Sequence, residues 1–326
     1  MKEHFVRRIA VLALAAVLLT GSASALFGRK EEPAEAVEGA PTVEDLEIST
    51  YRDVPYQAQF RVTASEGEVT YAVAEEPGKG TVTVDGSRFT YTPEEGMTGS
   101  DSFTYTATDS AGRTSLPATV QVTVEKTKSG VCYADTEGSP AAAAAQYLAE
   151  AGIFTGAKIG ENYYFEPDRT VSRSEFLAMA METAGREVTD VTMTGFCDDE
   201  SIPTWAKAYA AAGVADGIVQ GKTTAEGVAF QGEQAITFNE AATVLDRVLD
   251  LGDVELDVWY ADREEVPSWA AQAVGNMEAV SVLSAGSFGS ETMERAVTRA
   301  DAAQMLSAAK TLLDGEEPDG LFSWLK

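Results

Sequence analysis

The chain has 326 residues, more than a typical single domain, so two or three compact units are expected. Hydrophobic residues make up 44% of it, which is enough to bury substantial cores. The 52 acidic and 24 basic side chains give a formal net charge of −28, which repels phosphate backbones and anionic lipid headgroups. Nucleic acid is therefore excluded as an expected partner.

The first 25 residues have the pattern of a secretory signal peptide. A basic start that includes Arg7 and Arg8 precedes the apolar run 9–19, and the small residues 23–25 are typical of a cleavage site. An uncleaved anchor is the alternative, but the run is shorter than the roughly 20 residues that span a bilayer. Cleavage would remove His4, the only histidine. We therefore expect a secreted chain without Ser-His or Cys-His catalysis and without a histidine zinc site.

Residues 26–41 are acidic and poor in apolar side chains, which favours a solvated linker. Short alternating runs rich in Val, Thr, Tyr and Phe then occupy residues 42–125. Turn residues such as Asp85-Gly86 and Ala111-Gly112 separate these runs. Alternation with a period of two and regularly spaced turns predicts an antiparallel, all-β sandwich.

The stretch from Gly80 to Val124 resembles the bacterial Ig-like or cadherin-like modules of surface proteins. This resemblance implies a spacer or adhesion module and no catalysis. Cadherin-like relatives often bind calcium at module junctions, which makes Asp101 and Asp109 candidate ligands. Aspartates that stabilise turns are the alternative, and we predict no metal site and no cofactor.

Beyond Lys126, alanine-rich segments with helical spacing contain one motif three times. TVSRSEF at 170–176 returns as AITFNEA at 235–241 and as AVTRADA at 296–302. An opening aromatic-x-Asp, an apolar helix and a small-residue turn precede each copy. The period predicts three helix-loop-helix repeats.

The predicted organisation has seven segments. The short C-terminal tail ends in apolar residues that either dock on the helices or contact a partner or membrane surface. The segments are a signal peptide (1–25), an acidic linker (26–41), an Ig-like β-sandwich (42–125), three repeats (131–187, 194–251 and 258–313) and the tail (314–326).

A capping box explains most of the repeated motif. In such a box a hydroxyl accepts a hydrogen bond from the amide three residues later, and the acid at that position bonds back to the cap amide. Each copy therefore starts a helix. The pairs are Ser172 with Glu175, Thr237 with Glu240, and Thr298 with Asp301.

Arg173 and Arg299 are not explained by capping. They occupy the first helical position, where the helix dipole disfavours a cation. An arginine beside helix-start amides forms an anion site suited to a carboxylate, and a salt bridge to a neighbouring repeat is the alternative. Phe238 takes this position in the middle copy, so we expect that copy mainly to hold the fold.

The chain contains two cysteines, Cys132 and Cys197, beside the opening aromatics Tyr133 and Phe196. They are too few for a structural zinc site with four cysteines. Outside the cytoplasm they either form a disulfide or remain as two buried free thiols.

Together these features resemble the S-layer homology (SLH) family. They are the aromatic-x-Asp opening, a Trp-Ala helix start, a G-I-x-x-G turn, the F-x-P element at 165–167 and a closing [ST]-R-[AS]-[ED]. The resemblance spans about residues 131–313. It implies an all-α, pseudo-threefold domain that binds a bacterial cell-wall polymer, often a pyruvylated secondary polysaccharide, in grooves between repeats. The predicted fold class is thus multidomain, an all-β sandwich followed by three helix-loop-helix repeats.

By this resemblance, the arginines would pair with an acidic ketal, the tryptophans would lie at the groove, and the turn glycines would let sugar approach the backbone. Core packing is the alternative for the tryptophans. Departures from the family pattern at Pro140, Phe238 and Ala285 predict that at least one groove is degraded, most of all the one at the middle motif. The implied ligand-binding residues are Arg173, Arg299, Trp205, Trp269, Gly156 and Gly221.

The leading functional hypothesis is a secreted cell-surface protein, anchored to a cell-wall secondary polysaccharide or peptidoglycan-linked polymer by the repeats. The Ig-like module would act as a spacer. An adhesin whose Ig-like module binds a protein or glycan is the alternative. A wall hydrolase with paired carboxylates is less favoured, because no stretch of domain length remains unassigned.

Overall fold

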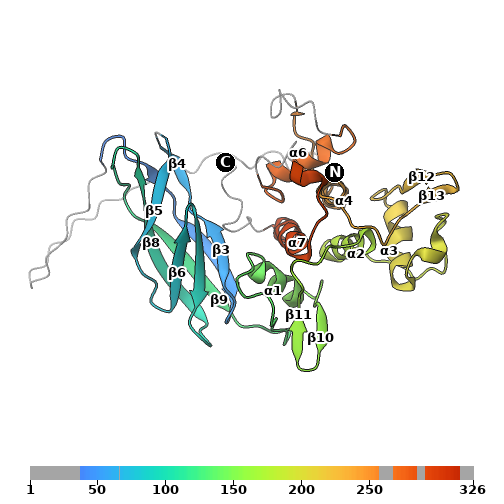
Figure 1. The fold of residues 1–326 in the computed structure, drawn as a ribbon, viewed down its shortest axis with the longest axis horizontal. Coiled ribbons are helices and arrows are strands. Elements are labelled where there is room, and N and C mark those ends of the chain that lie inside the picture. The colour runs from blue at the N-terminus through green and yellow to red at the C-terminus, as the bar shows by residue number, and fades with distance from the viewer. Residues whose placement is uncertain (1–36, 66, 257–266, 285–290, 316–326) are drawn as a thin grey trace, which may run out of the picture. The chain divides into compact units, whose positions relative to one another are not determined.

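The computed structural model describes residues 37–65, 67–256, 267–284 and 291–315 (Figure 1). The predicted signal peptide, most of the linker and nearly all of the C-terminal tail lie outside the described residues. The third opening motif, Tyr260-Ala261-Asp262, and the turn residue Ala285 lie outside them as well. Within the described ranges, no helix combines the length and the apolar character needed to cross a bilayer.

Residues 42–125 form a β-sandwich, as their alternating pattern predicts. Tyr105 illustrates the pattern, since it is fully buried on β8 between two partly buried threonines. One sheet has the strand order β2 (Leu46–Tyr51), β9 (Ala118–Glu125), β8 (Gly99–Asp109) and β5 (Val69–Glu75). The other has the order β3 (Tyr56–Gln59), β7 (Arg88–Pro93) and β6 (Gly80–Asp85), and β1 (Thr42–Val43) pairs with β4 (Val62–Ala64).

One strand pair corrects the expectation of an antiparallel sandwich. Strands β2 and β9 run parallel, with register from Leu46 opposite Val120 to Tyr51 opposite Glu125. The other described pairs in the sandwich are antiparallel. Because β2 and β9 lie at opposite ends of the sandwich sequence, no tight turn joins them and nothing imposes an antiparallel pairing.

Aromatic rings fill the centre of the sandwich. Phe60 stacks on Tyr105 and on Phe89, with ring centroids 4.4 and 4.7 Å apart. The Tyr105 hydroxyl donates to the Glu44 carbonyl at 2.6 Å, so its polar end is satisfied although the ring is buried. Burial raises the pKa of Tyr105 to about 12, which keeps the hydroxyl neutral.

The two aspartates considered as calcium ligands stabilise turns. Asp101 accepts hydrogen bonds from the amides of Gly78 and Lys79 and from the Tyr91 hydroxyl, each at 2.9 Å. Asp109 accepts from the amides of Ala111 and Arg113 in its own turn, and from the Arg113 guanidinium at 2.7 Å. Both aspartates therefore have the turn-stabilising role that the sequence analysis gave as the alternative to calcium binding.

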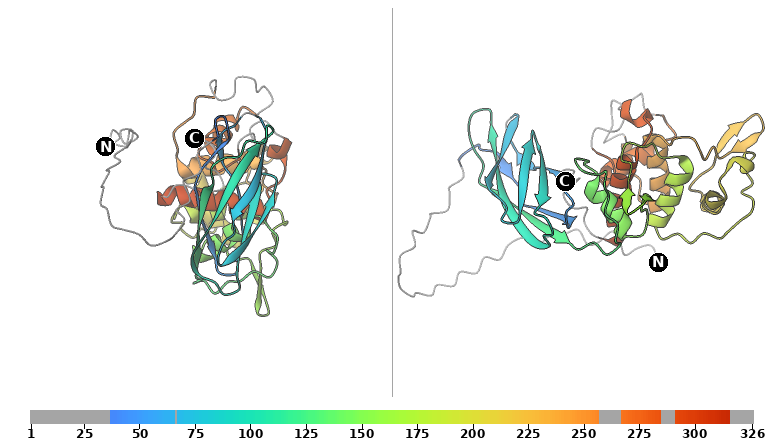
Figure 2. Two further views of the ribbon diagram at one scale, coloured as in Figure 1. Left: turned by 90° about the vertical axis from the view of Figure 1, so that its left-hand side faces the viewer. Right: turned by 60° about the horizontal axis from the view of Figure 1, so that its bottom comes forward.

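The described residues beyond 130 form helices with two small β-hairpins between them. The hairpins correct the expectation of an all-α region: their strands are only three residues long, too short for a detectable period (Figures 1 and 2). The helices are α1 (Ala142–Glu150), α2 (Arg173–Thr183), α3 (Thr204–Ala215), α4 (Phe238–Leu249), α6 (Ala271–Ala279) and α7 (Arg299–Asp314), with short 3₁₀ turns at Asp199–Ser201 and Glu291–Glu294. The hairpins pair β10 (Ala157–Ile159) with β11 (Asn162–Tyr164), and β12 (Lys222–Thr224) with β13 (Gly227–Ala229).

The three copies of the repeated motif meet in a closed ring of backbone hydrogen bonds. The Val171 amide donates to the Val297 carbonyl at 2.9 Å, and the Val297 amide donates to the Ile236 carbonyl at 2.8 Å. The Ile236 amide then donates to the Val171 carbonyl at 3.0 Å, which completes the circuit. Each repeat therefore contacts both others through the residue just before its capping box.

Each motif starts its helix with a capping box. The Glu175 amide donates to the Ser172 hydroxyl at 3.2 Å, and the Ser172 amide donates to the Glu175 carboxylate at 2.9 Å. The same reciprocal pair occurs in α4 and α7. Helices α2, α4 and α7 thus all begin at the ring.

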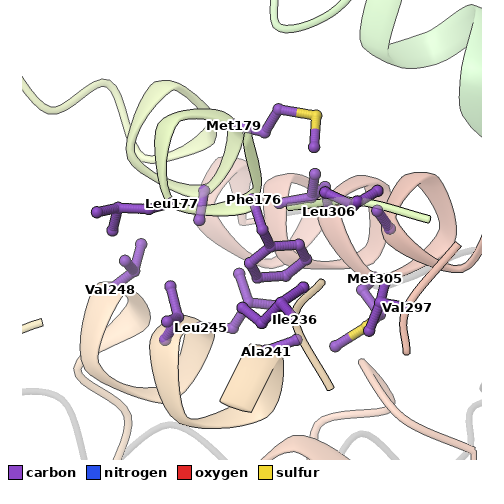
Figure 3. Close-up of a cluster of buried hydrophobic side chains, with 14 of the residues drawn as sticks. Phe176, Leu177, Met179, Ile236, Ala241, Leu245, Val248, Val297, Met305 and Leu306 are labelled. Atoms are coloured by element: carbon purple, nitrogen blue, oxygen red, sulfur yellow. The ribbon is translucent and has the colours of Figure 1, made fainter. Parts of the chain in front are cut away.

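Apolar side chains from the three helices share one core beneath the ring. Figure 3 shows Phe176 of α2 pointing into the space between α4 and α7, towards Ile236 and Met305. The Phe176 side chain is fully buried. The ring and this core together hold the three repeats as one packed unit.

Replacement of Phe176 by alanine tests this core. We expect Phe176→Ala to lower the free energy of unfolding by about 3–5 kcal/mol, because it leaves a cavity among three helices. Urea unfolding followed by helical circular dichroism measures the change. Met193→Ala, at a side chain 72% exposed, is the control, and equal effects of the two substitutions would contradict the assignment.

Candidate functional site

Arg173 joins the first repeat to the second. Its Nε donates to the Phe230 carbonyl at 3.1 Å, and its Nη1 pairs with Oε1 of Glu240 at 3.1 Å. The guanidinium also lies over the Phe230 ring, 5.8 Å from the centroid. Only 11% of the side chain is exposed. The arginine therefore leaves its own helix start and binds the loop and capping box of the next repeat.

Arg299 makes the corresponding contact from the third repeat to the first. Its Nη1 donates to the Phe165 carbonyl at 2.8 Å and to the Glu166 carboxylate at 2.9 Å. The guanidinium lies 5.0 Å from the centroid of the Phe154 ring, and 8% of the side chain is exposed. Burial lowers the pKa of Arg299, as does the charge of Arg169, but a guanidinium stays protonated in such a site.

For both arginines the sequence left two interpretations open, an anion site and a salt bridge to a neighbouring repeat. The structure shows the salt bridge in both cases. These contacts also remove the conflict with the helix dipole, because each guanidinium is held by carbonyl and carboxylate oxygens of another repeat. Phe238 occupies this position in the middle copy, and the guanidinium of Arg295 lies over its ring at 5.0 Å. The arginines at the first helical position therefore hold the repeats together.

The opening aromatic-x-Asp motif holds the same loops from within each repeat. Asp135 accepts hydrogen bonds from the amides of Phe165 and Glu166 at 2.8 and 2.7 Å. Asp198 accepts from the amides of Phe230 and Gln231, both at 2.8 Å. In each loop the amide of the phenylalanine donates a hydrogen bond to the aspartate, and the carbonyl of the same phenylalanine accepts one from an arginine of another repeat.

Gly156 and Gly221 have a structural reason to be glycine. Both have positive φ, +64° and +73°, which disfavours any other residue. A Cβ at Gly156 would collide with the Tyr164 carbonyl oxygen, and one at Gly221 would lie 2.7 Å from the Ala229 oxygen. Close packing of each hairpin against the turn before it thus accounts for both glycines without a bound sugar.

Trp205 and Trp269 are both exposed, with 51% and 58% of their surfaces accessible. Core packing, the alternative considered from the sequence, is therefore wrong for both. Trp205 lies in the first turn of α3, directly after Pro203 and Thr204. An exposed indole at this position is available to a ligand.

A groove lies beside Trp205, between the first and second repeats. Its volume is about 420 Å³, within the range of small-ligand sites. Residues of the first motif form one side, and residues of the second repeat form the other. The lining residues are Arg169, Thr170, Ser172, Glu175, Pro203, Trp205, Glu233 and Ala235.

Arg169 supplies the positive charge of this groove. Its Nη2 donates to Oε1 of Glu175 at 2.9 Å, and its Nη1 lies 3.9 Å from Oε2 of Glu166. Its side chain is 48% exposed, in contrast to Arg173 and Arg299. Glu175 therefore accepts hydrogen bonds from two donors, the Ser172 amide at the start of α2 and the Arg169 guanidinium in the groove.

Sequence reasoning missed Arg169, although a signal was present. It stands directly before the first motif, and the same position is Gln234 in the second copy and Arg295 in the third. Arg295 pairs with Asp301 at 3.1 Å and is 49% exposed, which matches the pairing of Arg169 with Glu175. Arg169 lies three residues before Ser172, outside the capping box to which the sequence pattern had drawn attention.

Neither proposed state of the two cysteines occurs. Cys132 and Cys197 are free, so the expectation of a disulfide is wrong. Both are also exposed, so the alternative of two buried thiols is wrong as well. Their neighbours Tyr133 and Phe196 turn their rings inward to pack on Phe165 and Phe230, so the adjacent cysteines face solvent.

Two family models match the chain, one within each of the regions described above. A bacterial cadherin-like domain matches residues 32–126, and an S-layer homology domain matches residues 133–177. The chain contains a cadherin-like and an SLH domain. The SLH match runs from the opening tyrosine through the first hairpin into α2, so it includes the whole TVSRSEF motif. Both are non-catalytic domain types, and an SLH domain indicates association with the cell surface.

No curated protein matches the chain. Similar solved structures include a protein described as an α-galactosidase/melibiase from Bacteroides fragilis, with 13% identity and a TM-score of 0.22 over 26% of this chain and 18% of that one. A second B. fragilis protein described as an α-galactosidase aligns with 14% identity and a TM-score of 0.22, over 28% of this chain and 19% of that one. The fibronectin(III)-like modules of CbhA from Clostridium thermocellum align with 16% identity and a TM-score of 0.19, over 27% of this chain and 98% of that one. At such TM-scores these likenesses carry no argument about function.

The charges at the interface of the first two repeats depend on pH. Burial alone would raise the pKa of Glu240, but the hydrogen bond from Lys222 and the charge of Arg173 outweigh it and hold that pKa below 4.5. A carboxyl with a lowered folded-state pKa stabilises the fold above its unfolded pKa, and this contribution is lost as the pH falls.

We therefore expect Glu240→Gln to lower the free energy of unfolding of the SLH region more at about pH 6 than at about pH 3.5. The loss relative to the wild type should be about 1 kcal/mol smaller at the lower pH. Urea unfolding of both proteins at the two pH values measures it. Glu226→Gln removes an exposed acid on the second hairpin and should show no such dependence. A pH-independent effect of Glu240→Gln would contradict the assigned ion pair.

The buried and the exposed arginines should differ in their effect on stability. We expect Arg299→Ala to lower the free energy of unfolding by about 2–3 kcal/mol, because it leaves the Phe165 carbonyl without a charged donor. Arg169→Ala should change it by less than about 1 kcal/mol, since that pair is half exposed. Parallel urea titrations compare the two variants, and equal losses would refute the distinction between them.

Proposed function

We propose that the protein is secreted and held noncovalently on the bacterial cell wall by a wall glycan that binds between the first two repeats. The cadherin-like module would then project from the wall as a spacer. The SLH match supports the wall as the site of attachment. The groove beside Trp205 supplies a place for the glycan.

The second and third repeats complete the binding domain in this proposal, although the family match covers the first. Equivalent backbone contacts support their membership. The Arg173 amide donates to the Gln234 carbonyl at 2.9 Å, the Phe238 amide to Arg295 at 3.3 Å, and the Arg299 amide to Arg169 at 2.8 Å. These three bonds join the same two motif positions at each junction, as expected of a pseudo-threefold domain.

The exposed indole of Trp205 in a polar groove is the observation on which this function rests. A sugar ring has one face of C–H groups, which packs on an indole, and an edge of hydroxyls, which need donors and acceptors. Trp205 offers the apolar surface, while Arg169 and Glu175 offer charged partners beside it. This combination suits a carbohydrate better than a purely apolar ligand.

An acidic substituent on the glycan, such as a pyruvyl ketal, would bind Arg169 in this proposal. Arg173 and Arg299 are engaged by oxygens of neighbouring repeats, whereas Arg169 has nearly half of its side chain exposed in the groove. The anion site was expected at Arg173, the first helical position, and is now proposed at Arg169, four residues earlier. At the middle motif Gln234 replaces this arginine, in keeping with a weaker groove there.

Removal of the indole tests the proposal. We expect Trp205→Ala to weaken sedimentation with purified wall sacculi by about 30-fold, or about 2 kcal/mol, because the sugar loses its stacking surface. Trp269→Ala is the matched control, since it removes an exposed tryptophan that lies near the start of another helix and is not among the residues lining the groove. Retention of Trp205→Ala on sacculi at wild-type level would overturn the groove as the wall-binding site.

A further inference from the structure

The groove contains an acid that the proposed glycan anchor does not use. Glu233 lines it from the second repeat, two residues before AITFNEA. Its side chain is exposed and makes no hydrogen bond or ion pair with any residue that the structure describes. Glu175, the other acid of the lining, is bound by Arg169 and by the Ser172 amide. Glu233 is thus the acid of the groove that has no protein partner in the described part.

The charges of the lining do not favour a purely acidic ligand. Arg169 is the one basic residue among those that line the groove, against Glu175 and Glu233. The charge of Arg169 is already matched by Glu175 at 2.9 Å, with Glu166 also nearby at 3.9 Å. An acid brought to Arg169 would therefore enter a groove with one net negative charge, next to an unpaired carboxylate.

We propose that the groove selects a glycan that carries an unacylated amino sugar, whose ammonium group pairs with Glu233. This inference rests on the proposed function and specifies its ligand. An ammonium has three donors and no acceptor, so it suits an exposed carboxylate and could not replace an acid at Arg169. A ligand with an amine at Glu233 and an acid at Arg169 would meet both charges across a groove of about 420 Å³. Acetylation of the amine would remove its charge.

The test uses the full chain and the soluble polysaccharide released with hydrofluoric acid from the sacculi that the protein binds. One half of the polysaccharide is N-acetylated with acetic anhydride, which changes amines and leaves carboxylates intact. Calorimetric titration measures the affinity of the wild type, Glu233→Gln and Glu226→Gln for both halves. Because the released polymer contains no peptide, the amines of wall peptides do not contribute to the titration.

We expect acetylation to weaken wild-type binding about fivefold, the size of one favourable exposed ion pair. Glu233→Gln should bind both halves equally, at the affinity of the wild type for the acetylated half. Glu226→Gln, which removes the same charge outside the groove, should behave as the wild type. Unfolding curves of the variants should coincide, because neither carboxylate makes a hydrogen bond or ion pair with a residue that the structure describes.

Equal affinity of the wild type for both halves would overturn the inference. It would leave the proposed function intact if Trp205→Ala still weakens binding. A loss on acetylation that persists in Glu233→Gln would also overturn it, because the amine would then lie elsewhere. Absence of wild-type binding to either half and to sacculi would overturn the proposed function itself.

Discussion

The architecture of the helical region depends on a ring of three backbone hydrogen bonds among Val171, Ile236 and Val297. The ring fixes the starts of α2, α4 and α7 side by side, because the capping box follows one residue later in each repeat. Once the helix starts are fixed, the apolar faces of the helices share one core. The inter-repeat arginines then lie within reach of the neighbouring loops. The groove is a consequence of the same junction, since it forms where the first motif meets the second repeat.

Local patterns in the sequence predicted much of this fold. Alternation predicted the sandwich strands, and the spacing of Ser172 and Glu175 predicted where α2 begins, because both depend on neighbours in the chain. The parallel pairing of β2 and β9 could not be read, since it joins strands about 70 residues apart. The hairpins were missed because three residues are too few to establish a period.

The candidate site was harder to predict than the fold. The resemblance implied that Trp205 lies at a groove. The structure has its exposed indole among the residues that line the groove of the first two repeats, and its binding role stays a prediction. The role of Arg173 depends on which oxygens surround it, and these come from Phe230 and Glu240, about 60 residues later. Arg169 and Arg173 have the same side chain in one segment, yet one is exposed in the groove and the other is largely covered at the interface. The local sequence does not distinguish the two arginines, because their exposure depends on residues that are distant in the chain.

The ring is closed by main-chain atoms alone, which gives the three repeats an unusual freedom to diverge. A substitution changes a side chain and leaves the amide and carbonyl of the ring in place, unless the new residue is proline. The second copy has Phe238 and Gln234 at the two positions where the other copies have arginine, and its backbone hydrogen bonds to both neighbours are present. Each junction can therefore have its own ligand preference, so one domain built from three units of the same backbone arrangement can carry three different recognition surfaces.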